Sequence, residues 1–190
     1  MTSHQYLSRL CAESYTRSDF EEADIEVIAE RSLEDGGVFC FRGTDEISDI
    51  ARDLRVLPWW TPGIGWVPRG FLLAGKRLAL KCVSHCLEKG YDSSRIELTG
   101  HSLGGAVALI VGSLLKRDEI SPRQIVTFGA PRCGRLKVLD DVHVTCYRNG
   151  KDIVPLLPPI FRRHCKLLQH GERNGFVKDH YAKNYVRMPK

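Results

Sequence analysis

The stretch Leu98-Thr99-Gly100-His101-Ser102-Leu103-Gly104-Gly105-Ala106 decides how the rest of the chain is interpreted. It contains a Gly-X-Ser-X-Gly pattern centred on Ser102, in which the glycines permit a sharp turn that larger side chains would obstruct. Residues 95–99 alternate between polar and apolar side chains, which is typical of a short strand. Residues 106–115 are apolar on all sides, which is typical of a buried helix. This context predicts a serine exposed at the apex of a strained strand-to-helix turn.

Residues 100–106 resemble the nucleophile elbow of the class 3 lipases, the family that contains the fungal triacylglycerol lipases. The resemblance implies an α/β-hydrolase. The pattern agrees, because predicted strands alternate with helices, which indicates a mainly parallel sheet with helices on both faces. Residues 25–30 and 38–41 read as two strands joined at a glycine turn, so we expect an N-terminal antiparallel hairpin. We therefore predict one small α/β-hydrolase domain over residues 1–190.

The tryptophans cluster in residues 57–66, where prolines and glycines exclude a long helix and predict a loop. Their side chains either line an acyl pocket, form an interfacial patch or cap the core. Residues 45–56, at the place of the fungal lipases' lid, carry one apolar stripe and predict a short helix. The other expected elements are a surface helix near residues 5–15, an acidic link at 18–22, a helix over 71–89 and strands at 124–128 and 142–147.

A serine hydroxyl becomes an effective nucleophile only when a neighbouring base takes its proton. In α/β-hydrolases the acid and then the histidine follow the serine along the chain. Residues 149–159 resemble the family's segment around its catalytic aspartate, which implies Asp152. His164, His170 and His180 come later, and spacing alone does not choose among them. The family's Asp-His-X-X-Tyr motif implies His180, although its tyrosines stand at +1 and +5, which leaves His170 as the alternative.

The lipases that this chain resembles hydrolyse esters through a tetrahedral intermediate. That intermediate needs hydrogen-bond donors aimed at its negative oxygen. Phe41-Arg42-Gly43-Thr44 resembles the family's strand-end motif, in which the residue after Arg-Gly contributes to the oxyanion hole. The resemblance therefore implies Thr44 as one donor. The backbone N–H of Leu103, directly after the nucleophile, is implied as the other.

The charge of the chain is unevenly distributed. Residues 1–50 hold four arginines and twelve acidic residues, a net charge of −8, whereas the remainder holds 24 basic and 11 acidic residues, a net charge of +13. A basic body is compatible with a solvated surface or with an anionic lipid surface. No nucleic-acid motif accompanies it, so we expect no nucleic-acid partner. The longest apolar stretch, residues 103–115, is too short to cross a bilayer.

Seven cysteines occur without a visible signal peptide, which predicts reduced thiols and a cytoplasmic location. Cys82 and Cys86 could share a metal with His85. However, no second ligand pair at suitable spacing follows, so we expect ordinary thiols and no metal.

These observations predict a serine carboxylic-ester hydrolase of the lipase and esterase class, acting through an acyl-enzyme without any cofactor. The expected partners are a lipid or small ester substrate and, transiently, a membrane surface. A phospholipase or acyltransferase on the same fold is the first alternative. A non-catalytic domain that binds lipid or protein is the second.

Overall fold

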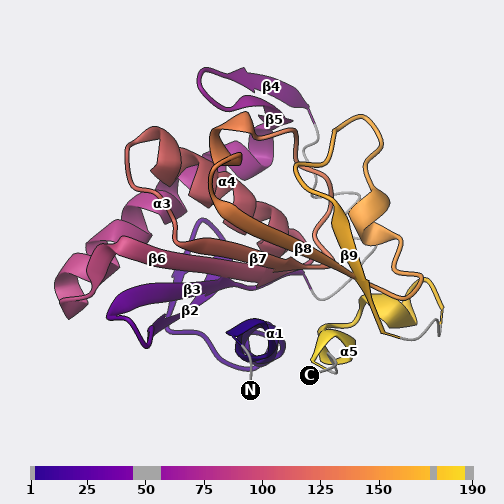
Figure 1. The fold of residues 1–190 in the computed structure, drawn as a ribbon, viewed down its shortest axis with the longest axis horizontal. Coiled ribbons are helices and arrows are strands. Elements are labelled where there is room, and N and C mark those ends of the chain that lie inside the picture. The colour runs from indigo at the N-terminus through magenta and orange to yellow at the C-terminus, as the bar shows by residue number, and fades with distance from the viewer. Residues whose placement is uncertain (1–2, 45–56, 172–174, 187–190) are drawn as a thin grey trace.

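A computed structural model describes residues 3–44, 57–171 and 175–186. Its centre is a seven-stranded sheet with the order β1-β2-β3-β6-β7-β8-β9 (Figure 1). Strands β3, β6, β7, β8 and β9 are mutually parallel, whereas β2 runs antiparallel to β1 and β3. The bounds are β1 Phe20–Glu22, β2 Ile25–Arg31, β3 Gly36–Phe41, β6 Asp92–His101, β7 Gln124–Phe128, β8 His143–Asn149 and β9 Leu167–His170. The mainly parallel sheet and the antiparallel pair β2–β3 confirm the prediction.

Helices cover both faces of this sheet (Figure 1). Helices α3 (Arg69–Lys89) and α4 (Leu103–Arg117) lie on one face, and α1 (Ser3–Glu13) and α5 (Ala182–Tyr185) lie on the other. Twelve residues of α4 are buried, which explains why its sequence is apolar on all sides. The predicted helix at residues 45–56 lies outside the described residues.

Three elements differ from the sequence-based expectation. The acidic link includes β1, and β9 extends the sheet beyond β8 where no strand is predicted. These strands have only three and four residues, too few to show an alternating pattern, and pairing with a longer neighbour stabilises them. The tryptophan stretch is a hairpin of β4 (Pro58–Thr61) and β5 (Gly65–Pro68) rather than a loop. Its Trp60 and Trp66 rings form a cross-strand pair, with centroids 5.7 Å apart.

The parallel strands bring distant parts of the chain to one edge of the sheet. Gly100 on β6 pairs with Thr127 on β7. The pairing of β7 with β8 likewise keeps the carboxyl ends of the three strands side by side. Ser102 follows β6, Gly129 follows β7, and Asp152 comes shortly after β8. Because functional groups of such sheets gather at the carboxyl ends of the strands, this edge is where the predicted site should assemble.

The cysteines correct one expectation. Cys146 on β8 forms a disulfide with Cys165, which lies just before β9, so the expectation of reduced thiols is wrong for this pair. Strand pairing explains it, because Leu167 lies opposite Cys146 and brings Cys165 close. The remaining five cysteines are free and buried. No helix within the described residues is long and apolar enough to span a bilayer.

Candidate active site

Ser102 stands at a sharp turn between β6 and α4, as the sequence predicts. The expectation that it is exposed at the apex is wrong, because neighbouring groups bury it completely. Its backbone has φ 53° and ψ −126°, a positive-φ conformation that is strained for any residue other than glycine. A side chain at Gly100 would overlap the backbone of Gly104, and one at Gly104 would overlap the carbonyl oxygen of Phe41. The two glycines are therefore required by close backbone approach.

The predicted acid and base converge on this serine from two later segments. Oγ of Ser102 lies 2.8 Å from Nε2 of His180, and Nδ1 of His180 lies 2.8 Å from Oδ2 of Asp152. Since a carboxylate can only accept, Nδ1 carries the proton and Nε2 is left to accept from the hydroxyl. All three side chains are buried, so water competes little for these hydrogen bonds.

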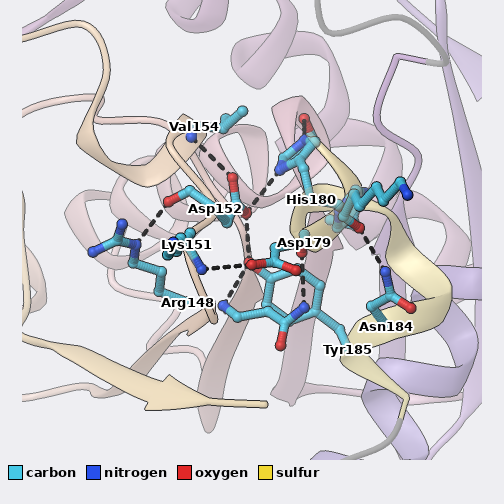
Figure 2. A network of polar contacts seen from close by, with 12 residues as sticks. Arg148, Lys151, Asp152, Val154, Asp179, His180, Asn184 and Tyr185 are labelled. Carbon is cyan, nitrogen blue, oxygen red and sulfur yellow. Dashed lines mark hydrogen bonds and ion pairs between the residues drawn. The ribbon is translucent and has the colours of Figure 1, made fainter. Parts of the chain in front are cut away.

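The Asp152 carboxylate is held by further donors (Figure 2). The backbone N–H of Val154 donates to Oδ1 at 2.9 Å, and the hydroxyl of Tyr185 donates to Oδ2 at 2.6 Å. Tyr185 is fully buried and accepts in turn from the backbone N–H of Asn149. Sequence reasoning assigned Tyr185 no role, because it stands five residues after His180 instead of three. The displaced motif tyrosine was the signal that could have found it.

Replacing Tyr185 with phenylalanine should lower the free energy of unfolding by about 1.5–3 kcal/mol. The ring would still pack, but Asp152 and the Asn149 N–H would each lose a buried partner. Urea unfolding of both proteins measures the difference. The matched control is Tyr181→Phe, at a half-exposed tyrosine, which should change stability by less than about 0.5 kcal/mol. Equal losses in the two variants would contradict this role of Tyr185.

A second set of contacts ties the aspartate loop to the histidine segment. Oδ2 of the buried Asp179 accepts from the backbone N–H of Lys151 at 2.7 Å. The carbonyl oxygen of Asp179 accepts from Nδ2 of Asn149 at 2.9 Å. Lys151 directly precedes Asp152 and Asp179 directly precedes His180 in the chain, and Figure 2 shows the contact between them. The distance between acid and base is therefore set by several hydrogen bonds rather than by their own contact alone.

His101, which precedes the nucleophile, connects the N-terminal region to the base. Its Nε2 lies 2.6 Å from the carbonyl oxygen of His180, which can only accept, so Nε2 is protonated. Nδ1 then accepts from the hydroxyl of Tyr15 at 2.7 Å, just after α1. Burial, with a smaller effect of the nearby His180, holds the pKa of His101 well below its ordinary 6.5. The ring consequently stays neutral.

This lowered pKa predicts a pH dependence of stability. Between the lowered pKa of the folded state and pH 6.5, the unfolded chain protonates His101 while the folded chain does not. The free energy of unfolding therefore falls as the pH falls through this window and is fully recovered above pH 6.5. His101→Gln keeps a donor for the His180 carbonyl and should remove a slope of about 1.4 kcal/mol per pH unit. Urea unfolding across this range measures the slope. The exposed His143→Gln is the control, and an unchanged slope in His101→Gln would contradict the prediction.

The two oxyanion candidates lie beside the serine. A Cβ at Gly43 would stand 3.1 Å from that of Ser102, so the end of β3 that carries Thr44 packs against the elbow. Leu103 is the first residue of α4, and its backbone N–H is one of the four without a partner inside a helix. Thr44 and Leu103 line the same hollow, of about 400 Å³. The structure thus brings both near the nucleophile.

With this geometry in place, comparison with known proteins gives a family. The model described as "Lipase (class 3)" matches residues 38–162, which is more than half of the chain. The chain belongs to the class 3 lipase family. The Lipase of Rhizomucor miehei is 36% identical over 132 residues, covering 63% of this chain and 36% of that protein. Phospholipase A1 PLIP1, chloroplastic, of Arabidopsis thaliana is 37% identical over 103 residues, covering 47% of this chain and 16% of that protein.

A solved structure supports the same family. The structure titled "Rhizomucor miehei lipase propeptide complex, native" is similar with a TM-score of 0.66 at 26% identity, covering 84% of this chain and 65% of that one. This class 3 lipase-family chain spans only part of the curated relatives' length, 36% of the Rhizomucor miehei protein and 16% of the Arabidopsis thaliana protein.

Other features of this class 3 lipase-family chain lie away from the triad. His170, the alternative base, is buried on β9, and its ring centroid lies 5.9 Å from that of Tyr185. His164 lies 3.0 Å from a guanidinium nitrogen of Arg135. Burial lowers the pKa of both histidines. Within the described part of the chain, no three His, Cys, Asp or Glu side chains are grouped as a metal site would require.

Proposed function

We propose that this chain hydrolyses carboxylic esters of lipids, with Ser102 as the nucleophile, His180 as the base and Asp152 as the orienting acid. The observation that carries the proposal is the unbroken series of contacts from Ser102 Oγ to His180 to Asp152, with both distances at 2.8 Å. A strained, glycine-flanked serine at the end of a central parallel strand supports it. Membership of the class 3 lipase family supports it further.

The chemistry follows from the hydrogen-bond directions. Oγ of Ser102 attacks the ester carbonyl while Nε2 of His180 takes its proton, and the carbonyl oxygen becomes an oxyanion. The Leu103 N–H and Thr44 stabilise that negative charge. Collapse releases the alcohol, which receives the proton from Nε2, and leaves an acyl-enzyme. Water then attacks the acyl-enzyme and gives a proton to Nε2. Collapse breaks the bond between the acyl group and Ser102 Oγ, the carboxylic acid leaves, and Nε2 returns the proton to Oγ. Asp152 holds Nδ1 and stabilises the imidazolium formed in each half-reaction.

Apolar side chains beside the triad favour lipid substrates over small soluble esters. Ile153 follows Asp152, Val177 and Tyr181 flank His180, and each is at least 40% exposed. Large apolar side chains that are exposed close in the chain to reactive groups suit a site that accepts hydrocarbon. Ser102 has no exposed surface, so the ester must displace neighbouring groups to reach Oγ.

The experiment is active-site labelling followed by a substrate panel. The wild-type chain should react with a fluorophosphonate probe, and mass spectrometry should place the adduct on Ser102. Triacylglycerols, diacylglycerols, phospholipids and short-chain esters then show which ester class gives the highest kcat/KM. Absence of labelling would indicate a non-catalytic binding domain. Labelling followed by acyl transfer to an added alcohol in preference to water would indicate an acyltransferase.

A further inference from the structure

The tryptophan hairpin, residues 58–68, exposes all three tryptophans of the chain. Trp59 is 52% exposed, Trp60 57% and Trp66 58%. Of the alternatives that the sequence leaves open, this exposure excludes the one in which the rings cap the core. Tryptophan is large and usually well buried, and leaving three of them in water on eleven consecutive residues costs free energy that an interaction would recover.

The exposure is built into the fold, because the hairpin itself is firmly seated. Val67 is fully buried and Ile64 is 4% exposed, so these side chains hold the hairpin on the body. A Cβ at Gly134 would overlap the carbonyl oxygen of Trp66, which shows how closely the two backbones meet. The hairpin that carries the tryptophans is therefore a fixed support, and it lies at the outer side of the α3–α4 layer (Figure 1).

The tryptophans occupy both faces of the hairpin. Trp60 and Trp66 lie opposite one another in the strand register and share one face. Trp59 lies on the other face, with the guanidinium of Arg69 5.5 Å from its ring centroid. Leu57, which precedes the hairpin, is 69% exposed. Rings on both faces suit a hairpin that is immersed in a surrounding medium better than one that is covered by a single flat partner.

Basic side chains border the same surface. The face with Trp60 and Trp66 opens onto a hollow of about 920 Å³ that is also lined by Ile160, Lys137 and Arg162. Lys137 and Arg162 are exposed, and Ile160 is 63% exposed. Arg135 also lines the hollow but is paired with Asp140. Among the described residues, no acidic side chain lines the hollow, and none of the three triad residues does.

We propose that the tryptophan hairpin and the bordering basic residues Arg69, Lys137 and Arg162 form a docking surface for anionic phospholipid bilayers. Tryptophan rings settle at the level of lipid headgroups, with their apolar part toward the acyl chains. Lysine and arginine at that depth attract anionic headgroups. The proposal concerns binding and does not depend on the proposed hydrolysis.

The charge pattern favours a bilayer over a protein partner or a second copy of the chain. A self-complementary interface would place the basic residues of one copy against those of the other around a two-fold axis. An anionic membrane offers negative charge over its whole surface and a medium for rings on both hairpin faces. A site for acyl chains of the substrate does not fit either, because the hollow contains no triad residue.

The test is co-sedimentation with vesicles, in the Ser102→Ala background so that no lipid can be consumed. Vesicles of phosphatidylcholine with about one-third phosphatidylglycerol should bind the chain, while pure phosphatidylcholine vesicles should bind it much more weakly. Trp60→Ser/Trp66→Ser should weaken binding by about tenfold or more. Lys137→Gln/Arg162→Gln should weaken it by about 25-fold, and added salt should do the same. The tryptophan fluorescence of the parent should shift to shorter wavelength on binding.

Matched controls use equally exposed residues elsewhere. Leu80→Ser, on α3 at 75% exposure, removes an exposed apolar side chain outside the surface. Lys89→Gln/Lys166→Gln makes the same change in net charge, and both controls should bind as the parent does. Equal binding by the tryptophan variant and its parent, or equal binding to neutral and anionic vesicles, would overturn the proposal. So would a dimer in analytical ultracentrifugation that Trp60→Ser/Trp66→Ser dissociates. Hydrolysis of a soluble ester, measured with Ser102 intact, reports separately on the proposed function.

Discussion

Ser102→Ala should abolish ester hydrolysis, with kcat falling by about 10⁴- to 10⁶-fold. The substitution removes Oγ, the atom 2.8 Å from His180 Nε2 that the proposed triad uses as its nucleophile. What remains is binding and oxyanion stabilisation, which alone give slow attack by water. Hydrolysis of a chromogenic acyl ester and labelling by a fluorophosphonate are the two measurements.

The control for this substitution is a measurement of its unfolding transition, which shows whether the variant is still folded. Alanine keeps the Cβ that the turn already accommodates, so the unfolding transition should change little, and far less than for a side chain at Gly104. A variant that is folded but keeps either hydrolysis or labelling would falsify the assignment of Ser102. A variant that loses both while its unfolding curve is retained supports the assignment.

His180→Ala should lower kcat by a similar factor, about 10⁴-fold or more, because the serine then has no base. His170→Ala provides the contrast at the other buried histidine, whose ring the structure places against Tyr185 rather than against Ser102. We expect His170→Ala to change stability and to leave kcat within about threefold of the parent. Kinetics on one soluble ester compare the two variants directly.

A reversed result would reassign the base. If His170→Ala lost activity while His180→Ala kept it, the contacts of His180 with Ser102 and Asp152 would not be the catalytic ones. Rescue of the inactive variant by added imidazole gives a second readout, because a small base can enter the space left by the ring and restore proton transfer. A purely structural histidine would not respond in this way.

The elbow is readable from the sequence because its physics is local. Gly100 permits close backbone approach to Gly104 within the turn, and the alternating strand and apolar helix on either side are short-range patterns. The approach of Gly104 to the backbone of Phe41 is the part that depends on a distant strand. Short-range patterns also indicate the antiparallel pair β2–β3 and α3, which ends at Gly90 in a left-handed conformation. Short strands such as β9 are different, because their stability comes from the neighbour with which they pair.

The tryptophan hairpin shows the limit of composition as a guide. Its prolines and glycines correctly exclude a helix, yet they are equally compatible with a loop and with a tight hairpin. The register that places Trp60 opposite Trp66 depends on how Val67 and Ile64 pack against the body. Whether the tryptophan rings point inward or outward is therefore a property of that packing. The sequence of the hairpin is compatible with buried and with exposed rings.

The elbow pattern and the resemblance to the class 3 lipases indicate the candidate serine, its candidate acid and the fold class from the sequence alone, because each motif is a short run of neighbouring residues. The choice between His170 and His180 depends on the tertiary structure, because both histidines are distant from Ser102 in sequence. The packing of the last segment of the chain brings the ring of His180 to Ser102. The same packing gives Tyr185 its contact with Asp152 and pairs Cys146 with Cys165. These contacts join residues that are distant in sequence, and no local pattern encodes which distant groups will meet.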